Sequence, residues 1–562
     1  MNKETQTLAL SVLDAGTNLG YERVTRRPIS SPIVKLDLLP RGPITVIAQI
    51  YLRTQSGKQH VLIPTSTSSE AWQVTRGHIR ESDLFTGEVV DLKMHEDLEG
   101  WDTPAHQQFE EHSKVVWTSP VEYRTDVTAE SRRNELAKRA GAYRDEDNRG
   151  PPAREEIQAH AAPIGRLEPS GIPPILPMER IEPDEVRSLT NGRWLVDFGK
   201  AVSGMLYFSA GLPEPVTTDT HPRAHRYVGT EGDGSFLTVV YGESLDLTTG
   251  DINRVLVAGM GLHDGGPRHV SASQGAQDNK PCFPNDHDHI LTQRDVYVDS
   301  GNLDEGAKRR FANARQSHFT THAFRYAEIC CTAEPPSGVY ALAYRTAMLE
   351  WGSFDSSNVR LNGGYELVKN AMKSNLLSVQ SDCPHREKLP YGGDLVASSP
   401  SAMHMFDMSA FYKKTIRDWI DGQWHSGGYT ETSIWQDLND FAGIGKGAGE
   451  TVWASAPPVL TVRHMQRYGD KDLLAETLSG HIRWLTFLNK EYDRGLQQRG
   501  YDSELKGYEG DGAGLSDWLA LRVKDTWLTH TAFYMASARA VAYIARKLES
   551  DVHEKKGMAL AK

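Results

Sequence analysis

The 562-residue sequence contains little cysteine, no long apolar run and no long run of basic residues. Two of its four cysteines are adjacent, and none belongs to a Cys-x-x-Cys pair; they are Cys282, Cys330, Cys331 and Cys383. This arrangement indicates free thiols and argues against a disulfide framework or a cysteine-based zinc site. No stretch approaches the roughly 18 consecutive apolar residues that a membrane span requires.

Acidic residues outnumber basic ones, 74 Asp and Glu against 62 Lys and Arg, so the net charge is −12. This argues against nucleic acid or an anionic membrane as a partner. The first thirty residues contain no basic segment followed by an apolar one, so we expect no signal peptide and a cytoplasmic protein, unless the N-terminus is incomplete. His287 and His289 alternate in an Asn-Asp-His-Asp-His run but lack a third spaced ligand, so we expect neither a metal site nor a cofactor.

Short runs of β-branched and apolar residues, bounded by turn residues, predict strands in the front half of the chain. These runs cover residues 44–52, 61–63, 115–117, 194–199, 205–215, 236–246, 295–298 and 324–329, while 77–103 is loop-rich. We therefore predict β-sandwich domains: an incomplete N-terminal accessory domain (1–120), a charged, proline-rich linker or insertion (121–189) and a second β-sandwich domain (190–335).

After residue 344 the apolar residues recur at three- and four-residue steps, which predicts amphipathic helices. The predicted helices cover 361–376, 395–424, 451–468, 473–488 and 527–548. Pro457 and Pro458 should break or kink the predicted helix 451–468 near its start. His404 is expected to be a core residue of the predicted helix 395–424. Residues 345–562 are thus predicted to form a helical domain.

The densest cluster of ionisable residues is the segment 381–394, Ser-Asp-Cys-Pro-His-Arg-Glu-Lys-Leu-Pro-Tyr-Gly-Gly-Asp. Pro384 and Pro390 exclude a continuous helix through it, whereas predicted helices lie on both sides. Crowded carboxyl groups separate their pKa values, so that one stays protonated while another is ionised, as acid–base catalysis requires. A salt-bridged surface loop would have a similar composition.

This segment resembles the glycoside hydrolase family 78 α-L-rhamnosidases, which carry an Asp-Cys-Pro-x-Arg run, then a Glu, then Gly-Asp. The resemblance extends, in order along the chain, to Trp-Leu-Val-Asp-Phe-Gly (194–199), His-Ala-Phe-Arg-Tyr-Ala-Glu-Ile (322–329) and, after the segment, Gly-Ala-Gly-Glu-Thr-Val-Trp (447–453), and covers most of the chain from residue 44. It implies an (α/α)6 toroid after β-sandwich domains, and an inverting glycosidase that releases terminal α-L-rhamnose from an oligosaccharide or glycoside.

The resemblance also implies site residues. It favours Glu387 as the general acid, with Asp382 close behind, and Asp382 and Asp394 as groups that hold sugar hydroxyls. Further substrate-binding candidates are Arg386, His385, Tyr391, Trp435, Asp437, Glu450 and Trp453. Helix capping by Glu450 and core packing by Trp453 are the alternative interpretations.

The chain departs from the family pattern in three places. Some members place a Glu one position later, where this chain has Lys388, and Pro390-Tyr391 replaces Gly-Trp. The Thr-Thr-x-Trp-Glu stretch that usually carries the general base is absent; the similar run at 432–436 comes too early and ends in Gln436, which cannot act as a base. Only about half of the twelve helices are expected. We therefore expect a C-terminally truncated chain with little activity of its own, and keep two alternatives open: a rhamnosyl-glucuronate lyase and a non-catalytic homologue.

Overall fold

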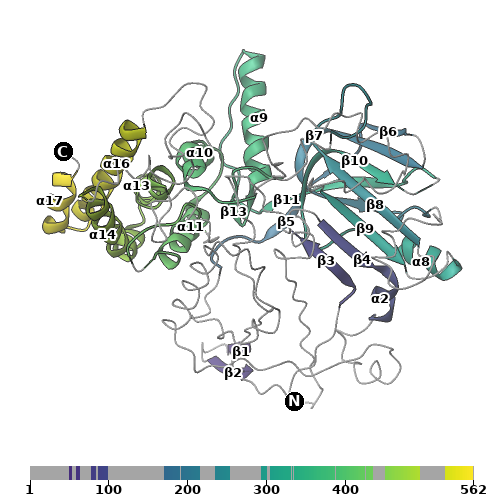
Figure 1. Ribbon diagram of the computed structural model, residues 1–562, viewed down its shortest axis with the longest axis horizontal. Helices are drawn as coiled ribbons and strands as arrows, with labels where there is room; N and C mark the ends of the chain where they lie inside the picture. The colour runs from purple at the N-terminus through teal and green to yellow at the C-terminus, as the bar shows by residue number, and fades with distance from the viewer. Residues whose placement is uncertain are drawn as a thin grey trace, which may run out of the picture.

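A strand-rich unit is followed by a helical unit in the computed structural model of the chain (Figure 1). The structure describes residues 50–53, 59–63, 77–83, 87–98, 170–189, 192–215, 235–253, 293–299, 304–330, 332, 334–385, 388–424, 426–433, 450–493 and 526–560. The predicted strand at 115–117 and the His287–His289 run lie outside these residues. No described helix is long and apolar enough to cross a membrane.

Nine described strands form one sheet in the spatial order β3-β4-β9-β8-β10-β7-β11-β5, with β6 paired to β7. Their bounds are β3 (Ile79–Asp83), β4 (Gly87–Asp91), β5 (Ile175–Ile181), β6 (Glu185–Ser188), β7 (Arg193–Phe208), β8 (Ser235–Gly242), β9 (Arg294–Asp299), β10 (His322–Cys330) and β11 (Val339–Thr346). A separate antiparallel pair joins β1 (Ile50–Arg53) to β2 (Gln59–Ile63).

The longest strand, β7, spans 16 residues and replaces the two separate strands predicted at 194–199 and 205–215. It pairs with β10 over both of its halves and with β11 over its second half, so it runs through the middle of the sheet. Val196, Leu206 and Phe208 from β7 are buried together with Phe324 and Ile329 of β10. Burial of these apolar side chains is the main contribution that holds the strands together.

The sheet extends beyond the boundaries predicted from composition. Residues 175–188, expected within a linker, form β5 and β6, which pair with β11 and β7. Residues 77–98, expected to be loop-rich, form β3, β4 and the helix α2 (Leu92–Asp97), and β4 pairs with β9 in parallel. These strands are held in the sheet by backbone pairing with strands that are distant in the sequence and by burial of apolar residues such as Val89, Val90 and Ile181.

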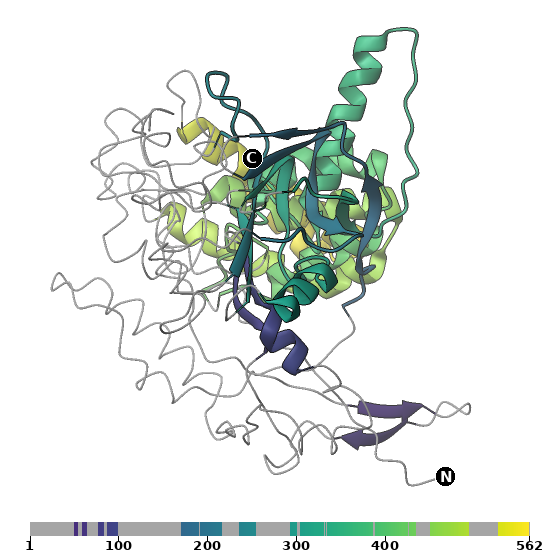
Figure 2. The same ribbon diagram turned by 90° about the vertical axis from the view of Figure 1, so that its right-hand side faces the viewer.

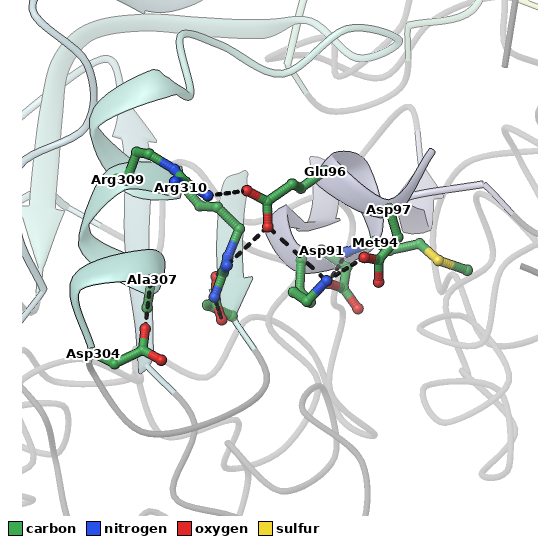
Figure 3. Close-up of polar contacts among 10 residues, drawn as sticks. Asp91, Met94, Glu96, Asp97, Asp304, Ala307, Arg309 and Arg310 are labelled. Atoms are coloured by element: carbon green, nitrogen blue, oxygen red, sulfur yellow. Dashed lines mark hydrogen bonds and ion pairs between the residues drawn. The ribbon is translucent and has the colours of Figure 1, made fainter. Parts of the chain in front are cut away.

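Figure 3 shows how α2 is fixed to this sheet through α8 (Glu305–Asn313). Glu96 of α2 accepts hydrogen bonds from Arg309 (2.5 Å) and Arg310 (2.9 Å). Arg310 also binds the buried carboxylate of Asp299 at the end of β9, at 2.5 and 2.9 Å. Asp91 and Asp304 cap the N-termini of α2 and α8 by accepting the amides of Met94 and Ala307.

The helical unit begins after β11. Its described elements are α9 (Val359–Asn375), β12 (Leu376–Leu377), β13 (Val379–Gln380), α10 (Gly392–Met405), α11 (Ser409–Asp421), α12 (Thr451–Ala454), α13 (Ala456–Tyr468), α14 (Lys471–Asp493), α16 (Thr526–Lys547) and α17 (Asp551–Leu560). Large aromatic residues fill its core, among them Phe406, Phe411, Tyr412, Trp419 and Trp484. α9 projects from the body of the molecule in both views (Figures 1 and 2).

Two predicted helices are divided in the structure. The helix expected over 395–424 breaks between α10 and α11, because the Met405 carbonyl accepts the amides of Trp351 (3.1 Å) and Gly352 (3.2 Å) and Phe406 is extended. The one expected over 451–468 divides into α12 and α13, with Pro457 and Pro458 in the first turn of α13, where missing amide donors cost nothing. His404 is exposed, contrary to prediction, because it lies on the solvent side of the last turn of α10.

Direct hydrogen bonds connect the two units where α9 passes the sheet. Asn370 donates to the Ala201 carbonyl of β7 at 2.7 Å, and Ser203 of β7 donates to the Ser374 carbonyl at 2.7 Å. Close by, Glu350 binds Arg345 of β11 (2.5 Å) and both Lys369 and Lys373 of α9 (3.0 Å each). The start of the helical unit is therefore held against the sheet by polar contacts.

Candidate active site

The ionisable segment forms a closed loop between β13 and α10. The Asp382 amide donates to the Leu389 carbonyl at 3.0 Å, and the Leu389 amide donates to the Asp382 carboxylate at 3.1 Å. These reciprocal hydrogen bonds close the base of the loop. Two residues of the loop, Arg386 and Glu387, lie outside the described residues.

A second segment, distant in the sequence, runs beside the end of this loop. The Gly392 amide donates to the Glu431 carbonyl at 2.8 Å, and the Ser433 amide donates to the Pro390 carbonyl at 3.0 Å. Between them, Tyr391 and Thr432 form an isolated antiparallel bridge. The chain path of residues 426–433 thereby fixes the direction in which α10 begins, and with it the position of Asp394 in the first turn.

The two glycines at the start of α10 allow a close approach to α12. A Cβ atom on Gly393 would lie 2.6 Å from the Trp453 ring, and one on Gly392 would lie 2.0 Å from the Trp453 carbonyl oxygen. Trp453 itself is buried. Glycine is required at both positions because any side chain would separate the two helices. Trp453 therefore has a packing role at this site.

Asp382 and Asp394 lie close enough for the charge of one to affect the other. Burial, and secondarily the charge of Asp382, raise the pKa of Asp394 to about 6. Burial also raises the pKa of Asp382, although hydrogen bonds from Cys383 and from the Leu389 amide act in the opposite direction. Protonation of both partly buried carboxyl groups is thus shifted toward higher pH, in the direction that acid–base chemistry needs.

Behind Trp453 lies a buried acidic pair that the sequence analysis missed in part. The Glu450 amide donates to the Glu431 carboxyl at 3.1 Å, and the Glu450 carboxylate caps α12 by accepting the Val452 amide at 2.8 Å. The same carboxylate forms an ion pair with His530 of α16. Burial, and then the charge of Glu450, raise the pKa of Glu431 to about 7, while the hydrogen bond from the Glu450 amide acts to lower it.

The loop also contacts the sheet unit. His385 Nδ1 lies 3.4 Å from a carboxylate oxygen of Glu243, one residue beyond β8. Lys388 is a largely buried residue, 9% exposed, and its ammonium group donates to the Thr321 carbonyl just before β10 at 2.6 Å. The site is therefore built at the junction of the two units.

Of the predicted site residues, Asp382 and Asp394 lie close enough for their charges to interact, and Trp453 packs against the glycines that precede Asp394. Tyr391 is the N-cap residue of α10, Glu450 caps α12, and His385 lies toward the sheet. Trp435 and Asp437, like Arg386 and Glu387, lie outside the described residues. Sequence reasoning missed Glu431 and His530, since only the packing of α10, α12 and α16 makes them neighbours. Within the described ranges, no group of three His, Cys, Asp or Glu side chains could hold a metal ion.

Comparison with known proteins gives a consistent result for the helical unit. Residues 350–562 match the family described as bacterial alpha-L-rhamnosidase 6 hairpin glycosidase domain. An α-L-rhamnosidase of Formosa agariphila is 24% identical over 347 residues, which are 60% of this chain and 31% of the relative. One of Streptomyces avermitilis is 28% identical over 240 residues, 42% of this chain and 21% of the relative. The chain thus spans less than a third of the length of either curated relative.

Solved α-L-rhamnosidase structures share the fold. The enzyme from Dictyoglumus thermophilum superposes with a TM-score of 0.58 at 20% identity, covering 91% of this chain and 44% of the other. The enzyme from Streptomyces avermitilis, solved in complex with L-rhamnose, superposes with a TM-score of 0.56 at 18% identity, covering 92% of this chain and 38% of the other. The enzyme from Aspergillus terreus superposes with a TM-score of 0.55 at 17% identity, covering 91% of this chain and 47% of the other.

Proposed function

Residues 350–562 belong to the bacterial α-L-rhamnosidase six-hairpin glycosidase family, and on that premise we propose that this chain carries the acid side of an α-L-rhamnosidase site. The substrate is a rhamnose-containing oligosaccharide or glycoside, from which terminal α-L-rhamnose is released. Both curated relatives described above bear the α-L-rhamnosidase name, and the structure from Streptomyces avermitilis contains L-rhamnose. The fold we propose is a partial (α/α)6 toroid after β-sandwich domains.

The observation that carries the proposal is the pair of crowded carboxyl groups, Asp382 and Asp394, at the two ends of the closed loop. Both have raised pKa values, chiefly because of burial. A protonated carboxyl can donate to a sugar oxygen and an ionised one can accept from a hydroxyl, so the pair suits a polyhydroxylated ring. Tyr391, half-buried at the start of α10, brings an aromatic ring to the end of the same loop, which suits the apolar face and the methyl group of a deoxy sugar.

The mechanism we propose is hydrolysis with inversion. Glu387, inside the loop, protonates the glycosidic oxygen as the C–O bond breaks, and a second carboxylate removes a proton from the attacking water. Asp382 and Asp394 hold the sugar hydroxyls. Asp382 is the alternative acid, because its carboxyl is partly buried and its pKa is raised.

The first test measures the product. A full-length gene product containing these residues is incubated with an aryl α-L-rhamnoside, and proton NMR records which rhamnose anomer appears first. The β-anomer is expected, since inversion reverses the configuration of an α-glycoside. Initial release of the α-anomer would refute inversion, and formation of an unsaturated uronate from a rhamnosyl-glucuronate would indicate a lyase. Assaying the 562-residue chain in parallel tests whether the water-activating carboxylate lies within it.

The second test assigns the acid. Glu387→Gln is expected to lower kcat by about 10²–10⁴-fold, the usual contribution of a general acid. The loss should be smaller for an aryl rhamnoside with a good leaving group, which needs less protonation. Glu366→Gln, on an exposed position of α9, is the matched control and should leave kcat unchanged. If Asp382→Asn shows the leaving-group dependence and Glu387→Gln does not, Asp382 is the acid.

A further inference from the structure

Lys388 occupies an unusual position for a lysine. It is almost fully buried, and its φ angle of +52° places it in the left-handed region that residues with a side chain seldom adopt. Burial of an ammonium group is unfavourable unless hydrogen bonds replace its hydration. A conformation with two unfavourable features persists only where surrounding contacts stabilise it.

One such contact crosses from the helical unit to the sheet unit. The Lys388 ammonium donates to the Thr321 carbonyl at 2.6 Å, directly before β10 in the centre of the sheet. On the loop side, the Lys388 amide donates to the Cys383 carbonyl at 3.2 Å. The side chain thus connects the closed loop to the residue that precedes β10 in the sheet unit.

The position of Lys388 within the loop gives this connection a consequence for the site. Lys388 directly follows Glu387 in the sequence and directly precedes Leu389, whose amide and carbonyl both bind Asp382. A shift of Lys388 would therefore move Leu389 and the hydrogen bonds that orient the Asp382 carboxylate. The contact between His385 and Glu243, at 3.4 Å, holds the other side of the same loop toward the sheet.

We propose that Lys388 is a positioning residue, whose ammonium group anchors the loop 382–389 to the sheet unit through the Thr321 carbonyl. The anchor fixes the distance of the loop carboxyl groups from the glycosidic bond. The kinetic part of this inference rests on the proposed hydrolase function, whereas the anchoring itself does not.

Three substitutions separate the side chain from the backbone. Lys388→Met keeps the length of the side chain but removes the ammonium group. Lys388→Gly also removes it, while favouring the left-handed backbone. Lys388→Arg keeps a cation and its hydrogen-bond donors. Circular dichroism confirms that each variant of the 562-residue chain retains its helical content.

The first readout is hydrogen–deuterium exchange of peptides covering 381–391, with peptides from α13 as the internal reference. Lys388→Met and Lys388→Gly are expected to increase the exchange rate of the loop by about tenfold or more without affecting α13. Lys388→Arg should retain most of the protection seen in the wild type. An unchanged rate in Lys388→Met, or protection in Lys388→Gly equal to that of the wild type, would overturn the anchor.

The second readout is kinetic, in the full-length gene product with an aryl α-L-rhamnoside. Lys388→Met and Lys388→Gly should lower kcat by about 10–100-fold, as expected for misplaced catalytic groups, with KM changed less than about threefold. Lys388→Arg should keep kcat close to that of the wild type. A rise in KM at constant kcat would contradict positioning. If the wild type releases no rhamnose, the proposed function fails, but the exchange experiment still decides whether Lys388 anchors the loop.

Discussion

The pKa values of the carboxyl groups at the site depend on burial more than on the charges of neighbouring residues. For Asp382, Asp394 and Glu431, burial is the largest cause of the raised pKa. A carboxyl that loses hydration favours its neutral form, which can donate a hydrogen bond. The raised pKa values of these three carboxyl groups therefore come mainly from the packing around them rather than from nearby negative charges.

Replacement of Glu431 by glutamine should stabilise the protein at alkaline pH. Its pKa is raised from 4.5 to about 7, so the folded state holds a proton that the unfolded state releases. Stability contributed by Glu431 accordingly falls as the pH rises from 4.5 through about 7. An amide does not titrate, and its oxygen can still accept from the Glu450 amide. The difference in unfolding free energy should grow to about 3 kcal/mol above pH 7.

Thermal unfolding of both proteins, measured from pH 4 to 9, checks this. The two melting temperatures should agree at the acidic end and separate as the pH rises. A difference that does not depend on pH would mean that the substitution acts through packing and that the Glu431 carboxyl is ionised in the folded state.

Gly393→Ala should destabilise the site although alanine favours helices. The added Cβ would lie 2.6 Å from the buried Trp453 ring, and overpacking of this kind costs about 1–3 kcal/mol. Gly363→Ala on α9 is the matched control, because no atom lies within 4 Å of its Cβ position. The free energy of unfolding of this control should rise by about 0.5–1 kcal/mol. Melting temperatures that rise in both variants would show that Trp453 moves freely.

At the scale of secondary-structure elements, short segments are fixed by partners that are far away in the sequence. The helix α2 spans six residues, too few to be stable in isolation. Its Glu96 depends on Arg309 and Arg310 of α8, and Arg310 in turn neutralises the buried Asp299 (Figure 3). Arg310 therefore connects two helices and the end of β9.

Arg310→Met should destabilise the sheet unit strongly. It leaves the Asp299 carboxylate buried without this partner, and removal of one member of a buried pair costs about 3–5 kcal/mol. Arg309→Met is the matched control, because Arg309 binds the same Glu96 but its side chain is 64% exposed. The control should cost at most about 1 kcal/mol. Denaturant unfolding followed by tryptophan fluorescence measures both, and equal losses would contradict the assigned role of Asp299.

At the scale of the whole molecule, the candidate site depends on the joint between the sheet and the helices. The loop contacts the sheet through Lys388, and the start of the helical unit is held at Glu350 by cations from β11 and α9. Burial acts to raise the pKa of Glu350, but hydrogen bonds and charges from Lys373, Lys369 and Arg345 outweigh it and lower the pKa. Glu350 is therefore ionised and stabilising at neutral pH.

Glu350→Gln should weaken this joint. A carboxyl with a lowered pKa stabilises the folded state above pH 4.5 and loses that contribution as the pH falls through the folded-state pKa. We expect a loss of about 1–2 kcal/mol at pH 7, between the values for exposed and buried ion pairs. Calorimetry should show the sheet and helical units melting further apart at pH 7 but not at pH 3. A loss that persists at pH 3 would exclude an electrostatic cause.

The sequence by itself determined the kinds of elements and the segment that we propose carries the chemistry. Apolar residues at helical spacing located α9, α13, α14 and α16 within a few residues of their bounds, and Pro457–Pro458 located the start of α13. These features depend on side chains that are neighbours along the chain. The loop around Asp382 was likewise visible, because its prolines, glycines and carboxyl groups are contiguous.

Only the tertiary structure decided which distant segments meet. The strands β4, β5 and β6 were not predicted because partners distant in the sequence, β9, β11 and β7, hold them in the sheet, and β3 pairs with β4. The break after Met405 depends on Trp351 and Gly352. The pKa of Glu431 rises to about 7 only because packing removes its carboxyl from water, and Lys388 becomes an anchor only because the sheet brings Thr321 within 2.6 Å. Burial and long-range hydrogen bonds belong to the packed chain, so no local pattern encodes them.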